Sequence, residues 1–187
     1  MTKSRFDAGV HMRLPYIAAL ALALGLSGCG EGSFGTRAPG FDFPQVAQSY
    51  VPLHSRDWIL RTHDGASVVI APGIAVTNAH NANMVDAASV IGKVECYDLL
   101  DYRTDRSAVV PTDVPFDGED VLDYGQDTDG NLRVSRGDVR QFWPAAFGYI
   151  SDAGPGFSGG PVVDAKTGAL LGITYGYEGD EGAQTRL

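Results

Sequence analysis

The stretch that decides the fold is Pro155-Gly156-Phe157-Ser158-Gly159-Gly160-Pro161-Val162. A serine that acts as a nucleophile needs a tight, exposed turn that directs its hydroxyl outward. It also needs backbone N–H groups nearby for the oxyanion that develops during attack. Glycines on both sides of Ser158 permit such a turn and leave room for a substrate backbone. Taken alone, the stretch also fits an ordinary Gly-rich hairpin loop.

A second motif lies upstream, where the apolar run Ile74–Thr77 leads into Asn78-Ala79-His80. This pattern predicts a strand that ends at a histidine. A lone histidine is more often structural than catalytic, so this motif indicates a catalytic role only in combination with the motif around Ser158. His54 and His63 have no comparable context, and we expect both to be surface residues.

Short apolar runs separated by Gly, Pro, Asp and Asn fill the chain from about residue 50 onward, and the sequence contains 24 glycines. Short, regularly spaced strands with turn signals between them indicate an all-β sandwich or a pair of barrels. The expected strands are Trp58–Thr62, Ser67–Ala71, Ile74–Thr77, Ser89–Val94, Leu99–Arg103, Val121–Tyr124, Leu132–Val139, Ala146–Ser151, Gly160–Val163 and Leu170–Tyr175.

Together the two motifs resemble those of the trypsin-like (chymotrypsin-fold) serine peptidases, in particular the bacterial members without disulfides. The resemblance covers about residues 57–180. It implies an all-β fold of two packed, six-stranded antiparallel β-barrels with the active site between them. In that family another strand and usually a helix follow where this chain ends. We therefore expect the second barrel to be incomplete at the C-terminus, unless another element fills the gap.

The same resemblance assigns roles to individual residues. Ser158 would be the nucleophile, His80 the general base, and the N–H groups of Gly156 and Ser158 the oxyanion hole. The third catalytic residue opens a strand after the histidine, and the best match is Asp98 in Asp98-Leu99-Leu100-Asp101-Tyr102-Arg103. Asp101 is the alternative, and either acid also fits a solvated loop.

The resemblance extends to substrate binding. Asp152 lies six residues before Ser158, where trypsin-like enzymes carry the acid of the S1 pocket that selects Arg or Lys; a simple turn aspartate is the other interpretation. Tyr175 and Gly176 match the edge strand to which a peptide substrate pairs. Phe157 replaces the aspartate that pairs with a freed N-terminus in digestive members, so we expect no zymogen switch of that kind.

Residues 1–28 predict an export signal. The run Ile17–Leu26 is apolar but shorter than the roughly 20 residues that a membrane-spanning helix needs. Leu26-Ser27-Gly28-Cys29 resembles the lipobox of bacterial lipoproteins, which implies cleavage before Cys29 and acylation of its thiol. In lipoproteins of this type an aspartate directly after the cysteine signals retention in the inner membrane. Because Gly30 stands there instead, the resemblance implies a lipid anchor in the outer membrane of a bacterial envelope. An ordinary secretory signal is the alternative.

The rest of the chain divides into a flexible tether at 29–48, which lacks apolar periodicity, and a protease domain at 49–187. With Cys29 acylated, Cys96 has no disulfide partner, and we expect it to be a small buried apolar residue. We expect no metal and no cofactor, because the serine mechanism needs neither.

The formal net charge of -9 argues against a nucleic-acid partner. The sequence thus predicts an endopeptidase that cleaves polypeptides through an acyl-enzyme. The alternative is a catalytically inactive, protease-like binding module tethered to the envelope.

Overall fold

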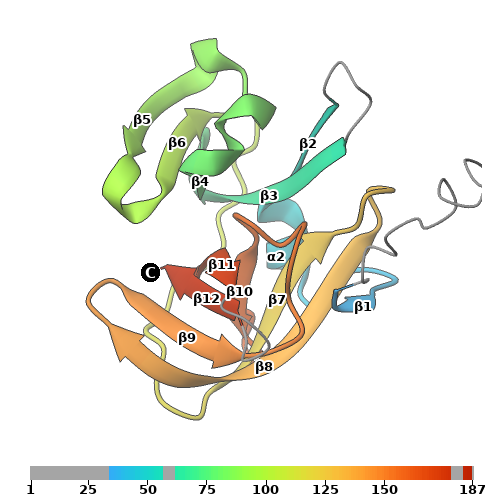
Figure 1. Cartoon of the computed structure of the whole chain (residues 1–187), viewed down its shortest axis with the longest axis vertical. Helices are drawn as coiled ribbons and strands as arrows, with labels where there is room; N and C mark the ends of the chain where they lie inside the picture. Colours follow the sequence, from blue (N-terminus) through green and yellow to red (C-terminus); the bar gives the residue numbers. More distant parts are fainter. Residues whose placement is uncertain (1–33, 57–61, 178–182, 187) are drawn as a thin grey trace, which may run out of the picture. The chain divides into compact units, whose positions relative to one another are not determined.

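The computed structural model describes residues 34–56, 62–177 and 183–186, which lie within one compact unit, Ser33–Leu187. Strands dominate it, and helices are short (Figure 1). In chain order the elements are β1 (Thr36–Arg37), α2 (Pro44–Ser49), β2 (Tyr50–Arg56), β3 (Thr62–Ala71), β4 (Ile74–Asn78), the 3₁₀ helices η1 (Ala79–Met84) and η2 (Ala87–Ser89), β5 (Val90–Val94), η3 (Glu95–Tyr97), β6 (Leu99–Arg103), β7 (Asp120–Gln126), β8 (Leu132–Trp143), β9 (Ala146–Ile150), β10 (Pro161–Asp164), β11 (Leu170–Tyr177) and β12 (Ala183–Arg186).

The first sheet is antiparallel, with the strand order β2-β3-β4-β6-β5. The inner strand β3 buries consecutive residues because both of its faces are covered. Val68 belongs to the hydrophobic cluster that the two sheets share, whereas Val69 belongs to a cluster within the first sheet. Five strands are described here, where the resemblance implied six.

The second sheet has the order β1-β8-β7-β10-β11-β12-β9, and β8 also pairs with β9. The ladder that runs from β8 through β7, β10, β11 and β12 to β9 therefore returns to β8. β12 pairs with β11 on one side and with β9 on the other, so this edge of β11 is covered. β12 is thus the element that fills the expected gap.

One hydrophobic cluster joins the two sheets, which lie against each other in Figure 1. Its buried members come from β2 to β4, from β7, β10 and β11, and from α2 and the segment between the sheets. They are Val46, Tyr50, Ala66, Val68, Val76, Val110, Leu122, Tyr124, Val163, Leu170 and Ile173. This shared core fixes the spacing between the two sheets, and the candidate site lies along the same junction.

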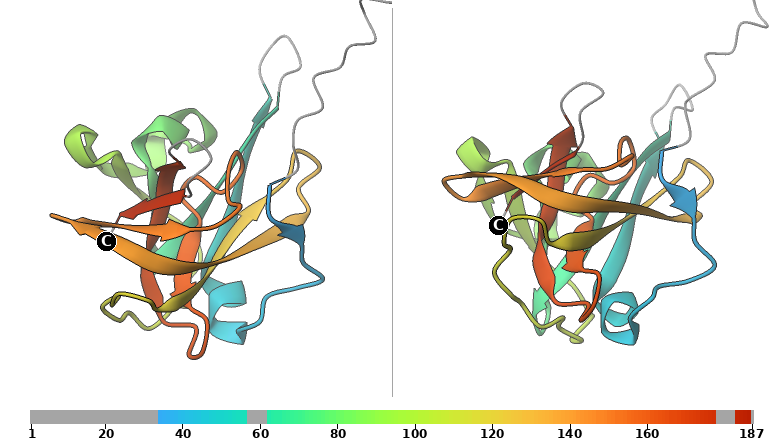
Figure 2. Two further views of the ribbon diagram at one scale, coloured as in Figure 1. Left: turned by 60° about the horizontal axis from the view of Figure 1, so that its bottom comes forward. Right: turned by 90° about the horizontal axis from the view of Figure 1, so that it is seen from below.

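The stretch expected to be a flexible tether is part of the fold from Phe34 onward. β1 lies beside β8 and pairs with it (Figure 2). The side chain of Val46 in α2 is completely buried. Pro44 suits the first turn of α2, where its missing N–H has no partner to lose. No apolar periodicity marks this stretch, because one short helix and a two-residue strand are too brief to produce one. The predicted signal and Cys29 lie outside the described residues.

Most expected strands are present at the expected positions, with ends that differ by a few residues. The strand expected at Trp58–Thr62 lies outside the described residues except for Thr62, where β3 begins. The prediction for Cys96 was wrong: its side chain is exposed in η3, because this single 3₁₀ turn stands at the surface beside β5. Cys96 is a free thiol.

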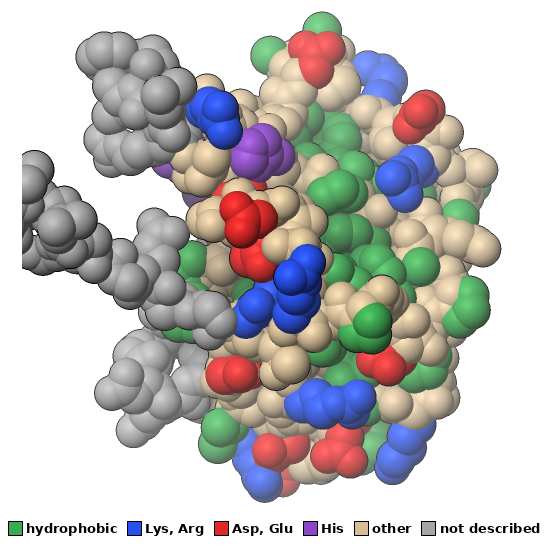
Figure 3. Space-filling view, turned by 90° about the vertical axis from the view of Figure 1, so that its right-hand side faces the viewer, with side chains coloured by type: hydrophobic (Ala, Val, Ile, Leu, Met, Phe, Trp, Pro, Cys, Tyr) green, Lys and Arg blue, Asp and Glu red, His purple; other side chains and the backbone are tan. Residues whose placement is uncertain are grey.

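The surface in Figure 3 carries acidic and basic side chains interspersed around a band of hydrophobic ones. This face therefore presents no extended field of one sign. Among the described helices, none is both long and apolar enough to cross a membrane.

Candidate active site

His80 sits at the start of η1, directly after β4, and Asp98 holds it at two atoms. One carboxylate oxygen of Asp98 accepts the His80 backbone N–H at 3.0 Å, and the other lies 2.7 Å from His80 Nδ1. An ionised carboxylate can only accept, so this contact places the ring proton on Nδ1 and leaves the Nε2 lone pair available.

The pairing of β4 with β6 explains why Asp98 reaches His80 although 18 residues separate them. Asn78 lies opposite Leu99 in this ladder, and the Ala79 N–H donates to the Asp98 carbonyl at 2.9 Å. Asp98 has a φ of 52°, a left-handed conformation that aspartate tolerates better than most residues. The intervening chain is taken up by η1, η2, β5 and η3.

The alternative acid lies elsewhere. Asp101 is inside β6, where it pairs with Val76 of β4 and Gly92 of β5, and no contact with His80 is present in the described residues. Partial burial raises the pKa of its carboxyl. The structure therefore brings Asp98, and not Asp101, to His80.

Ser158 lies in a turn that requires glycine at two positions, Gly156 and Gly159. Gly156 and Gly159 have φ values of 92° and 79°. A Cβ on Gly156 would lie 1.9 Å from the Gln126 carbonyl oxygen, and one on Gly159 would lie 2.1 Å from that of Ala66. Both the backbone conformation and the lack of space thus exclude a side chain at these two positions.

The first sheet holds the backbone of Ser158. Its carbonyl accepts the Ala66 N–H of β3 at 2.8 Å and the side-chain amide of Asn81 at 3.0 Å. Asn81 also donates to Thr77 Oγ1 at 3.0 Å and is buried. These bonds tie the serine turn, which leads into β10 of the second sheet, to β3 and to η1, the helix that carries His80.

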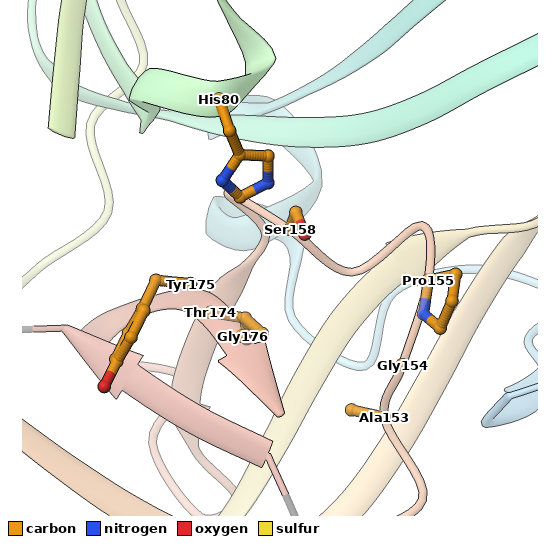
Figure 4. Close-up of a pocket in the computed structure, with 8 residues that line it drawn as sticks. All are labelled: His80, Ala153, Gly154, Pro155, Ser158, Thr174, Tyr175 and Gly176. Atoms are coloured by element: carbon orange, nitrogen blue, oxygen red, sulfur yellow. The ribbon is translucent and has the colours of Figure 1, made fainter. Parts of the chain in front are cut away.

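His80 and Ser158 border the same pocket, of about 260 Å³. Figure 4 shows the imidazole ring beside the Ser158 side chain. The other lining residues form two walls, one before Ser158 in the chain and one from β11. They are Ala153, Gly154, Pro155, Thr174, Tyr175 and Gly176.

Two backbone donors border the serine. Within the described part of the chain, the N–H groups of Gly156 and Ser158 donate no hydrogen bond, whereas those of Phe157, Gly159 and Gly160 are used inside the turn and its neighbours. Such donors are available to a negatively charged oxygen held next to Ser158 Oγ.

The wall from β11 offers an edge for an extended peptide. The β10–β11 ladder ends where Pro161 meets Ile173, although β11 continues to Tyr177. Gly176 pairs with Gln184 of β12, on the other side of the strand. Tyr175 and Gly176 thus border the pocket at the place where the resemblance puts substrate pairing.

Asp152 does not line the pocket. Ser135 Oγ donates to its carboxylate at 2.5 Å, and the Asp152 N–H donates back to that oxygen at 3.2 Å, which fixes the residue on β8. The geometry thus fits the turn interpretation rather than an acid at the base of S1. Counting residues back from Ser158 could not reveal this, because the direction of the side chain depends on β8.

A different acid lies behind the pocket wall, and the sequence did not single it out. Asp123 of β7 is fully buried, and its carboxylate accepts the hydroxyls of Tyr149 and of Thr174, the latter at 2.8 Å. Burial raises the pKa of Asp123 to about 7, the two hydroxyl donors oppose the rise, and the charge of Asp152 adds to it. Its only sequence signal is an acid within the apolar run Val121–Tyr124.

Among the described residues, no group of three or more His, Cys, Asp or Glu side chains is placed to hold a metal ion.

No protein-family model matches the sequence, and no curated protein matches it either. Solved structures do match. The active form of the Rv3671c protease from M. tuberculosis superposes with a TM-score of 0.64 at 20% identity, over 81% of this chain and 83% of that one. The fold is that of the chymotrypsin-like serine proteases.

Two further neighbours with this fold are longer than the chain. The serine endoprotease from Yersinia pestis gives a TM-score of 0.63 at 22% identity, and the HtrA-type protease AlgW, solved with a tripeptide, gives 0.61 at 19%. Each matches 75% of this chain, which in turn spans 60% and 56% of their respective lengths. The all-β, chymotrypsin-type fold that the resemblance implied is thereby confirmed, with two antiparallel sheets in the described residues.

Proposed function

We propose that the chain is a serine endopeptidase in which Ser158, His80 and Asp98 act together. The observation that supports this proposal is that Ser158 and His80, whose Nδ1 lies against Asp98, line one pocket, beside two backbone N–H groups that donate no hydrogen bond within the described residues. A fold alone does not imply an activity, so the argument rests on this site.

In the proposed reaction, Ser158 Oγ attacks the carbonyl carbon of the scissile bond while His80 Nε2 accepts the hydroxyl proton. Asp98 keeps the ring proton on Nδ1 and stabilises the imidazolium that forms. The N–H groups of Gly156 and Ser158 donate to the developing oxyanion. His80 then gives its proton to the leaving amine as the C–N bond breaks, and an acyl-enzyme ester remains on Ser158.

Water completes the cycle. His80 accepts a proton from a water molecule, whose oxygen attacks the ester, and the proton returns to Ser158 as the acid product leaves. The substrate would lie along β11 near Gly176 as an added strand, so an extended segment of polypeptide is the proposed substrate class.

The test is covalent labelling of the purified full-length protein with a fluorophosphonate probe. The parent should be labelled at Ser158, Ser158→Ala should not be labelled, and Ser107→Ala should behave as the parent because Ser107 is an exposed loop residue. Thermal melts of all three proteins establish that they are folded. A folded parent that stays unlabelled would contradict the enzyme and favour a protease-like binding module.

A further inference from the structure

The residues just before and within β1, Phe34–Arg37, lie against the loop that carries Ser158. We call Phe34–Arg37 the N-terminal segment and Asp152–Ser158 the serine loop. The Gly35 N–H donates to the Asp152 carbonyl at 3.0 Å, at the start of the serine loop. Thr36 and Arg37 then pair with Val134 and Arg133 of β8.

The ring of Phe34 covers Gly154, which lines the pocket. A Cβ on Gly154 would lie 2.3 to 2.7 Å from three atoms of this ring, so the ring rests directly on the glycine backbone. Phe34 also packs against the cluster that contains Ala153 and the fully buried Phe157. The pocket wall is thus backed by an aromatic side chain from the other end of the chain.

The next residue makes a second contact with the loop. A Cβ on Gly35 would lie 2.6 Å from Phe157 Cζ, so the backbone of the N-terminal segment packs on the ring of Phe157. Arg133 of β8 fixes the segment from behind, because its guanidinium donates to the carbonyls of Phe34 at 3.0 Å and Gly35 at 2.5 Å.

The serine loop needs such support. It contains Gly154 and Gly156, which have many accessible backbone conformations. An oxyanion hole works only when its donors are held within about 0.5 Å of the productive geometry. The contact with Phe34 restricts the loop two residues before Gly156, whose N–H is one of the two proposed donors.

We infer that Phe34 is a positioning residue: by packing on Gly154 and Phe157, the N-terminal segment holds the serine loop in the shape that the oxyanion hole requires. The inference rests on the proposed function for its catalytic consequence.

The first readout tests the contact without reference to activity. Hydrogen–deuterium exchange of peptides covering 151–160 is measured in the full-length parent, in Phe34→Ala and in Phe116→Ala. Phe116 is the matched control, since it is a phenylalanine that is 60% exposed in the segment before β7. Exchange in 151–160 should rise about tenfold or more in Phe34→Ala alone. Unchanged exchange in that variant overturns the inference, whatever the activity of the parent.

The second readout separates positioning from loss of folded protein. The fluorophosphonate labelling rate constant should fall about tenfold in Phe34→Ala, less than the 10²–10³ typical of removing one oxyanion donor outright. The labelled fraction at completion should stay that of the parent, and the pH midpoint of labelling should not move, because His80 and Asp98 are unaffected. A reduced final fraction at an unchanged rate constant would indicate a merely structural role and overturn the inference.

A conservative variant covers the case in which Phe34→Ala does not fold. Phe34→Leu keeps an apolar contact with Gly154 and should show rate constants between those of the parent and of Phe34→Ala. If Phe34→Leu folds and labels as fast as the parent while its exchange in 151–160 also matches, an aromatic side chain at this position is not what holds the loop.

Discussion

Asp98 contacts His80 at both its backbone N–H and its Nδ1, whereas Asp101 lies in β6 without such a contact. We therefore expect Asp98→Asn to lower the labelling rate constant of Ser158 by about 10³–10⁴, because an amide donor in place of the carboxylate favours the wrong histidine tautomer. Asp101→Asn should stay within about twofold of the parent, and it serves as the control. A larger loss of labelling rate in Asp101→Asn than in Asp98→Asn would assign the proposed role to Asp101 instead of Asp98.

Asp123 gives the folded protein a pH dependence of its own. Its pKa is about 7 when folded, mainly through burial, and near 4 in an unfolded chain. Between these values the folded state holds more protons at this site, so the contribution of Asp123 to the free energy of unfolding is largest below about pH 4. It falls as the pH rises to about 7, by on the order of a few kcal/mol.

Asp123→Asn removes this titration. In urea unfolding at pH 4.5 and pH 7.5, the stability of the variant relative to the parent should improve at the higher pH. Asp117→Asn, at an exposed acid, should show the same difference from the parent at both pH values. A pH-independent difference for Asp123→Asn would mean that the buried carboxyl is already ionised in the folded protein.

Some residues of the candidate site could be predicted from the sequence, and others could not. Ser158 and His80 stand in local sequence motifs that predicted one shared site, and both residues line the same pocket; their catalytic roles stay a prediction. The choice between Asp98 and Asp101 needed the register of β4 against β6, which no local pattern encodes. Asp152 fitted a count from Ser158 but turns to Ser135, and Phe34 and Asp123 act through contacts formed only in the folded chain.

At the scale of elements, strands with long apolar runs were predictable and brief or irregular elements were not. β7 and β11 were expected from the mainly apolar stretches Val121–Tyr124, which Asp123 interrupts, and Leu170–Tyr175. β2 contains Pro52, which argues against a central strand, and the structure places it at the edge of its sheet. β12 is short and polar, and it becomes a strand because β11 and β9 offer it a partner on each side.

The N-terminal elements β1 and α2 could not be predicted from a local pattern either, and the segment that contains them also contacts the serine loop. Residues 34–48 have no apolar period. β1 nevertheless forms because it pairs with β8, and α2 forms because Val46 packs into the shared core. Phe41 and Phe43 pack against that core as well. Truncation at residue 48, where the sequence suggested a domain boundary, would remove these contacts together with those of Phe34 on the serine loop.

At the scale of the whole molecule, the proposed active site depends on both sheets at once. His80 and Asp98 lie in segments that connect strands of the first sheet, and Ser158 lies in the loop that leads into β10 of the second. The hydrogen bonds from Ala66 and Asn81 to the Ser158 carbonyl cross between them. Any motion of one sheet against the other would separate the base from the nucleophile, so we expect the two sheets to behave as one cooperative unit.

Leu122 provides the test, because it is buried in β7 within the cluster that both sheets share. Leu122→Ala should lower the free energy of unfolding by about 2–5 kcal/mol. Hydrogen exchange in mild denaturant should then show that peptides from β3 and β4 lose as much protection as those from β7 and β10. Loss confined to the second sheet would mean that the sheets unfold separately, and that the alignment of His80 with Ser158 is maintained only by the bonds around the serine turn.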